Sequence, residues 1–165
     1  MGGRAGGGAG MGKGLRSALA SAEASIKGRS IENAYVFDSK GNLVYRKTEG
    51  EQQAKNDPYS KLTQNGRSVE VPVEHLKNNI MTHNHPSGDS FSSGDLKMAI
   101  KGDADEIRAV GKMTYSLKRP KGGWKVWQGE VLESYRKFSS TSKSKHETMQ
   151  KLAKKYNWDY KATAN

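Results

Sequence analysis

The chain has 165 residues, enough for one domain of ordinary size with tails, and only 33% of them are hydrophobic. It contains no cysteine, which excludes disulfides and thiolate metal sites, so a transition-metal site would have to use His, Asp, Glu and water. The N-terminus lacks an apolar signal region and no run approaches membrane-spanning length, so we expect a cytoplasmic protein with no membrane partner.

The net charge of +11 is concentrated at the two ends of the chain. Residues 1–30 carry five basic and one acidic side chain, and residues 136–165 carry eight basic and two acidic ones, whereas residues 31–135 are close to neutral. Ends of this kind attract nucleic acid, an acidic protein or an anionic surface, or they serve only to keep the chain in solution. We therefore expect flexible basic tails beside a near-neutral domain, with both roles open.

The first predicted elements are a glycine-rich segment, a helix and a hairpin. Residues 1–14 include eight glycines, and such a segment cannot recover its ordering entropy by burial, so we expect it to be flexible. Apolar side chains recur at helical spacing over residues 15–26 and stop before Gly28, which predicts a helix. Residues 31–37 and 43–45 favour β-structure and flank a polar turn, which predicts a β-hairpin.

The remaining chain is predicted to alternate between strands and helices. An Asp-Pro and an Asn-Gly pair favour loop or short helix over residues 50–67. Strands are predicted at residues 68–73, 80–83, 106–110, 113–117 and 124–127, and helices at residues 96–101, 131–138 and 146–156.

Strands mixed with helices in this order predict an α/β fold, a layered single domain with a mixed β-sheet flanked by helices. We assign that domain to residues 15–138. The glycine-rich segment 1–14 precedes it, and a basic linker and C-terminal helix, residues 139–165, follow it. Trp158 lies among the lysines of the second tail, where it could stack on single-stranded bases, although docking onto the domain is the favoured interpretation.

A short stretch in the middle of the chain carries the clearest chemistry. His83 and His85 are one residue apart, so in a strand both imidazoles project from the same face. Pro86 and the Ser-Gly-Asp sequence after it predict a turn, and Ser92 or Ser93 is a candidate helix N-cap with Asp95 in the first turn. The turn can return the carboxylate to the imidazoles. Two nitrogens and one oxygen leave a fourth tetrahedral position for water, which is the ligand count of a catalytic zinc.

This stretch resembles the signature of the JAMM (also called MPN-plus) metalloproteases, which is a distant upstream Glu, then His-x-His-Pro, then Ser-x-x-Asp. Residues 83–89 read His-Asn-His-Pro-Ser-Gly-Asp and residues 92–95 read Ser-Ser-Gly-Asp. The wording is most similar to the RadC-type bacterial branch and to JAMM domains of phage and mobile-element proteins. The loop between the second His and the Ser is one residue shorter than in the commonest form of the motif.

The resemblance implies a JAMM/MPN-like fold with cytidine-deaminase-like layering. It implies that His83, His85 and Asp95 are the ligands of a Zn2+ ion, and that the protein cleaves a peptide or isopeptide bond of a protein or peptide substrate. The expected setting is the cytoplasm of a bacterial or phage-infected cell.

A zinc hydrolase also needs a carboxylate that takes the proton of the attacking water. The resemblance places this Glu on the first strand, where Glu32 is the matching residue, and it assigns Ser92 to supporting the water or the oxyanion. Glu32 could otherwise be an exposed strand-end carboxylate, and Glu70 and Glu74 are its rivals. Ser92 could be a helix cap alone, and the two roles are compatible.

Two other functions remain open at this level. The protein could be a RadC-like module associated with nucleic acid through its basic ends, or an assembly domain of a phage or mobile element that retains the metal site. The other two histidines, His75 and His146, have no partner pattern and are expected to face solvent.

Overall fold

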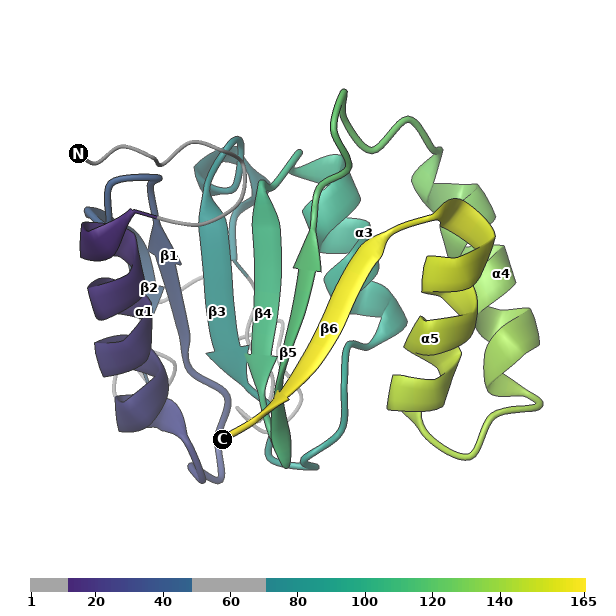
Figure 1. Cartoon of the computed structure of the whole chain (residues 1–165), viewed down its shortest axis with the longest axis horizontal. Helices are drawn as coiled ribbons and strands as arrows, with labels where there is room; N and C mark the ends of the chain where they lie inside the picture. Colours follow the sequence, from purple (N-terminus) through teal and green to yellow (C-terminus); the bar gives the residue numbers. More distant parts are fainter. Residues whose placement is uncertain (1–11, 49–70) are drawn as a thin grey trace.

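The computed structural model describes residues 12–48 and 71–165. Within them the chain forms an α/β domain around one six-stranded sheet of order β2-β1-β3-β4-β5-β6, in which β3 and β4 are parallel and the other neighbours antiparallel (Figure 1). This confirms the predicted mixed sheet in a single small domain. The elements are α1 (Lys13–Ile26), β1 (Ala34–Phe37), β2 (Leu43–Lys47), the 3-10 helix η4 (Val73–His75), β3 (Ile80–Asn84), α3 (Ser93–Lys101), β4 (Glu106–Val110), β5 (Met113–Lys118), α4 (Gln128–Ser139), α5 (Lys145–Tyr156) and β6 (Asp159–Ala164).

Helices cover both faces of the sheet (Figure 1). Because side chains alternate along a strand, β1 sends Ala34 and Val36 to one face and Tyr35 and Phe37 to the other. The second face packs against the apolar stripe of α1 in a small separate cluster. The first face forms the main core with α3, α4 and α5, and β3 crosses the middle of the sheet with all five residues buried.

The C-terminal region belongs to the domain, so the predicted boundary at residue 138 and the flexible basic C-terminal tail are wrong. Strand β6 pairs with β5 along its whole length, from Lys118↔Asp159 to Met113↔Ala164. Helix α5 buries Met149 and Leu152 in the main core, and Trp158 docks there as favoured. The lysines that gave this region a tail-like composition lie mainly on its exposed side. The high positive charge therefore led to the prediction of a tail where the chain forms an amphipathic helix and a final strand.

Residues 124–127 do not form the predicted strand. Trp124 is buried and its Nε1 donates a hydrogen bond to the carbonyl of Ala104 at 3.2 Å, which holds this loop on the core. Lys125 has a positive φ of 54°, which is outside the β region, and Trp127 occupies the N-cap position of α4 without a side-chain capping bond. The strand prediction for residues 124–127 is therefore wrong: the segment is a loop that is attached to the core through Trp124.

The other predicted elements agree with the structure within a few residues where they can be compared. Helix α1 begins two residues earlier than expected, inside the glycine-rich segment. Most of the predicted flexible segment 1–14, the predicted loop or short helix over 50–67 and the first half of the predicted strand 68–73 lie outside the described residues. The second half of that prediction is wrong, because residues 71–72 have no regular structure and Val73 begins the 3-10 helix η4. None of the helices described here has the length and apolar character needed to cross a membrane.

Candidate metal centre

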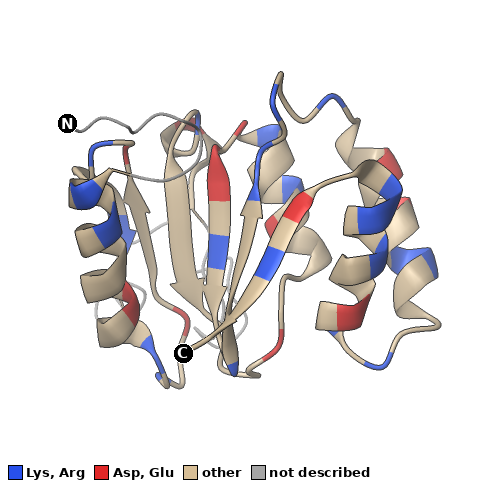
Figure 2. Cartoon of the chain, viewed as in Figure 1, with Lys and Arg blue, Asp and Glu red and all other residues tan. Residues whose placement is uncertain are grey.

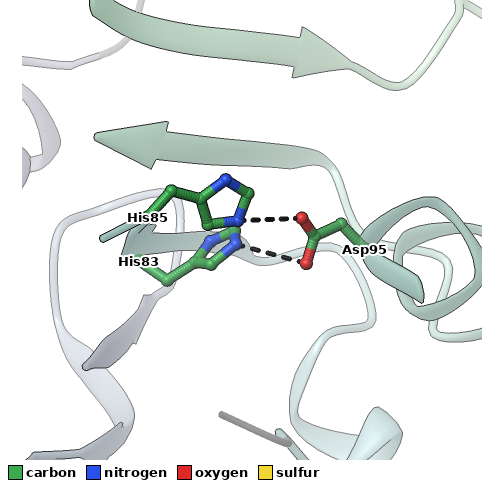
Figure 3. A group of neighbouring side chains, drawn as sticks. All are labelled: His83, His85 and Asp95. Atoms are coloured by element: carbon green, nitrogen blue, oxygen red, sulfur yellow. Dashed lines mark ion pairs between the residues drawn. The ribbon is translucent and has the colours of Figure 1, made fainter. Parts of the chain in front are cut away.

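His83, His85 and Asp95 lie together at the end of β3 (Figure 3). His83 comes from the buried strand itself, His85 from the residue just after it, and Asp95 from the first turn of α3. The Nε2 atom of His83 is 3.2 Å from Asp95 Oδ1 and that of His85 is 3.1 Å from Asp95 Oδ2. One ligand atom from each residue lies within 4.8 Å of the other two, so the three can share one metal ion.

His83 is completely buried, and its ring nitrogens are the donors in this cluster whose surroundings most favour a metal ion. Apart from its ion pair with Asp95, neither ring nitrogen hydrogen-bonds to any residue that the structure describes. A buried polar nitrogen without a hydrogen bond is costly and rare, and metal coordination would remove that cost at Nε2. The donor set therefore fits a metal ion.

His85 is oriented by the turn that follows it. Its Nδ1 lies 2.9 Å from the carbonyl oxygen of Asp89, and because a carbonyl can only accept, Nδ1 carries the proton and Nε2 is the atom presented to the site. Burial lowers the pKa of His85, but the carboxylate of Asp95, the charge of Glu32 and the Asp89 carbonyl outweigh it and raise the pKa to about 9. Without a metal, His85 is thus a cation paired with Asp95.

Asp95 is held in place by a capping box at the start of α3. Its Oδ2 accepts a hydrogen bond from the Ser92 N–H at 3.0 Å, and its own N–H donates to Ser92 Oγ at 3.2 Å. Burial raises the pKa of Asp95, but the two imidazoles lower it well below its usual value, so the carboxylate is ionised. Ser92 is therefore a helix cap that orients a ligand, whatever further role its hydroxyl has.

The sheet brings Glu32 to the same face as the two histidines. Strands β1 and β3 are antiparallel with Ala34 opposite His83, and the Asn84 N–H to Asn33 carbonyl bond of 3.3 Å continues this pairing beyond β1. Continuing it one more residue sets Glu32 opposite His85, and opposed residues share a face. The effect of the Glu32 charge on the pKa of His85 agrees with this position.

The rival carboxylates and the remaining histidines are not part of the site as described. Glu74 is exposed on η4, and Glu70 lies outside the described residues. His75 and His146 were expected to face solvent, but each is half-buried and contacts another side chain. His75 is half-buried with its ring stacked on Tyr45, and His146 is half-buried with Nδ1 2.7 Å from the hydroxyl of Tyr160.

Asn84 supports the site from the other side of β3, because side chains alternate along a strand and its two neighbours are the histidines. Its side-chain oxygen accepts from the Asn33 N–H at 2.6 Å, and its amide nitrogen donates to the carbonyls of Ile31 at 3.0 Å and Arg29 at 3.2 Å. These bonds fix the chain segment that contains Glu32 against the strand that contains the ligands.

Sequence reasoning missed Asp89, which it treated only as a turn residue. Burial raises the pKa of its side chain, but backbone N–H groups of Lys145, Ser90 and His146 outweigh burial and lower it. The acidic residue in a turn and the Ser144 cap before α5 were the available signals, but nothing in the sequence connects them across more than fifty residues.

Comparisons of this chain with protein-family models, with curated proteins and with solved structures found no significant match. The functional interpretation therefore depends on the side chains themselves. What they provide is a buried two-histidine, one-aspartate cluster, together with Glu32, whose charge raises the pKa of His85.

Proposed function

We propose that this protein is a zinc-dependent metallopeptidase or isopeptidase of the JAMM type. The observation that carries the proposal is the meeting of His83, His85 and Asp95 at one buried point. Extension of the β1–β3 register by two residues beyond Ala34 puts Glu32 on the same face, which supports the proposal. The α/β layering, with helices on both faces of a mixed sheet, is compatible with a JAMM/MPN-like domain.

Zinc would be held by Nε2 of both histidines and by the Asp95 carboxylate. Two nitrogen ligands and one oxygen ligand are typical of catalytic zinc, which leaves a coordination position open for water or substrate. When bound, the ion supplies a Lewis acid that polarises the scissile carbonyl and lowers the pKa of its water to about 7.

Asp95 and Glu32 have different roles in the proposed reaction. Asp95 is ionised and tied to two imidazoles, so it serves as a ligand and not as a base. Glu32 takes a proton from the attacking water and gives it to the leaving nitrogen, which leaves a carboxylic acid and an amine as products. Ser92 Oγ accepts the Asp95 N–H, so its own hydroxyl proton is available to donate to the developing oxyanion.

A second candidate, binding of nucleic acid or of an acidic protein, is favoured by the surface charge. Residues 136–165 have eight basic and two acidic side chains, which lie on α4, α5, β6 and the connection between the two helices as part of the folded domain (Figure 2). Basic groups fixed on a rigid surface attract a polyanion with a marked dependence on salt. A DNA-binding titration at several salt concentrations tests this role independently of hydrolysis.

Replacement of Glu32 by glutamine tests the enzymatic proposal. Glutamine keeps the size and one acceptor oxygen but cannot take a proton, so the Glu32→Gln variant should keep its zinc and its fold while cleavage falls by about 10²–10⁴-fold. Glu74→Gln, on the exposed turn η4, is the matched control and should cleave at the wild-type rate. Wild-type cleavage by Glu32→Gln would assign the base elsewhere, and a zinc-loaded wild type that cleaves no peptide or ubiquitin-like substrate would contradict the proposal.

A further inference from the structure

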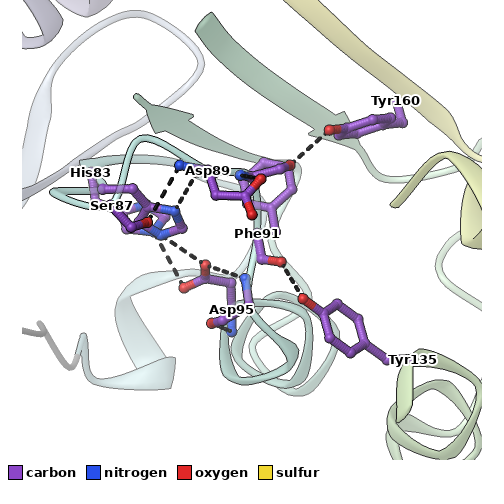
Figure 4. Close-up of polar contacts among 10 residues, drawn as sticks. His83, Ser87, Asp89, Phe91, Asp95, Tyr135 and Tyr160 are labelled. Carbon is purple, nitrogen blue, oxygen red and sulfur yellow. Dashed lines mark hydrogen bonds and ion pairs between the residues drawn. The ribbon is translucent and has the colours of Figure 1, made fainter. Parts of the chain in front are cut away.

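The loop between the metal ligands His85 and Asp95, which contains Asp89 (Figure 4), is attached to the start of α5. The backbone carbonyl of Asp89 accepts the Nδ1–H of His85 at 2.9 Å. Its side chain accepts two backbone N–H groups at the start of α5, from Lys145 at 2.8 Å and from His146 at 3.1 Å. One residue thus contacts a ligand with its main chain and a distant helix with its carboxylate.

The contacts with α5 are favourable for two physical reasons. The first N–H groups of a helix have no partner within the helix, and the helix dipole attracts an anion to this end. Ser144 already caps the helix from within, because its Oγ accepts the Glu147 N–H at 3.1 Å. The Asp89 carboxylate accepts the two N–H groups that precede Glu147 in the helix, those of Lys145 and His146. The docking of α5 and the position of the loop therefore depend on each other.

Neighbouring residues reinforce this link on both sides. The hydroxyl of Tyr160, on β6, lies 2.7 Å from Ser90 Oγ and 2.7 Å from His146 Nδ1. The hydroxyl of Tyr135, on α4, donates to the Phe91 carbonyl at 2.8 Å. Ser90 and Phe91 are fully buried. Through these hydroxyl contacts the loop is held by α4 and β6 (Figure 4), and Tyr160 also connects it to α5.

We propose that Asp89 is a positioning residue of the metal centre, which couples the docking of α5 to the orientation of His85. The inference rests on the proposed metal site and extends it, because it makes metal affinity a property of the C-terminal α5 and β6 as well as of the three ligands. Partners that orient a metal-binding imidazole commonly contribute about 10–100-fold in metal affinity. The alternative is that Asp89 only stabilises α5 as a helix cap.

The Asp89→Asn and Ser144→Ala variants of the full chain separate these alternatives. An asparagine keeps one acceptor oxygen but turns an NH2 group toward backbone donors, so at least one link to α5 is lost. Ser144→Ala removes a cap of the same helix without touching the loop. Zinc affinity is measured by competition with a chelator, and thermal stability is measured for both variants.

We expect Asp89→Asn to weaken zinc binding by about 10–100-fold, while Ser144→Ala leaves it within about threefold of wild type despite a similar loss of thermal stability. Equal effects of the two variants on zinc affinity, or none from Asp89→Asn, would overturn the proposal. If Asp89→Asn does not fold, Tyr160→Phe replaces it, since it removes only the hydroxyl that joins Ser90 to His146. Weaker zinc binding by Tyr160→Phe than by Ser144→Ala would then support the proposal, and equal effects, or none from Tyr160→Phe, would overturn it.

Nitrogen NMR of the metal-free protein gives a readout that needs no zinc. In wild type the His85 Nδ1 proton should exchange slowly because it is held by the Asp89 carbonyl, and in Asp89→Asn it should exchange faster. Unchanged exchange would refute the positioning role. A wild-type chain that binds no zinc would instead refute the proposed function, while the ring-nitrogen signal would still decide the role of Asp89.

Discussion

Zinc affinity should continue to rise with pH well above neutrality, because zinc and a proton compete for one atom of His85. The Asp89 carbonyl holds the Nδ1 proton, so the proton that leaves on metal binding is the one at Nε2. The ordinary histidine pKa of 6.5 is raised to about 9 in the metal-free site, chiefly because the Asp95 contacts outweigh burial. The Nε2 proton is therefore still bound at pH 7.

The magnitude follows directly from this pKa. Below pH 9 the apparent zinc affinity should increase about tenfold per pH unit, so at pH 7 it should be about 100-fold weaker than its high-pH plateau. An imidazole of unshifted pKa would instead reach its plateau near pH 7. The raised pKa thus predicts a rise between pH 7 and pH 9 that an ordinary histidine would not produce.

The measurement is zinc competition with a chelator at pH 6, 7, 8 and 9, combined with calorimetry in buffers of different ionisation enthalpy. Close to one proton from His85 should be released per zinc at pH 7. Asp95→Asn is the control, since removing the carboxylate should weaken affinity overall and move the plateau toward pH 6.5. An affinity that is flat from pH 7 to pH 9, with no proton release at pH 7, would refute the proposed ion pair.

Three further predictions concern the metal, the stability of the fold and its pH dependence. The His83→Ala, His85→Ala double variant should lose most of its zinc by elemental analysis, and full retention would exclude the site. Deletion of residues 140–165 should abolish the cooperative thermal transition. It removes the buried side chains of Met149, Leu152 and Trp158, and the free energy gained by burying them, about 1.5–3 kcal/mol each, is comparable with the net stability of a domain. A shortened chain that melts cooperatively would contradict the packing of α5 and β6. The metal-free protein should be destabilised by up to about 3 kcal/mol as pH rises through 9. The pKa of His85 is raised from 6.5 to about 9 by folding, so the stability that this residue contributes is complete below pH 6.5 and lost above pH 9. Denaturant unfolding at pH 6 and pH 10 measures the difference, and equal stability at the two pH values would contradict the prediction.

Local patterns in the sequence determined much of the fold and the three candidate ligands. The helical spacing of apolar residues in α1 and the β-favouring runs of β1, β4 and β5 depend on neighbours a few positions away, and the structure confirms them. The pair His83 and His85 shares a face because side chains alternate along any strand, and Asp95 returns to them because a turn and a helix cap follow within ten residues. Interactions of this range are readable from composition and spacing.

Tertiary structure decided the features that depend on long-range pairing. The pairing of Ala34 with His83, which extends toward Glu32 and His85, follows from the register of β1 against β3, and the sequence does not encode that register locally. The C-terminal lysines suggested a tail, but burial of Leu152 and Trp158 and the pairing of β6 make this segment part of the folded domain, with most of its lysines exposed. Asp89 acquires its contacts with α5 only after that docking, because a hydrogen bond between residues more than fifty positions apart exists only once the packed core has brought them together.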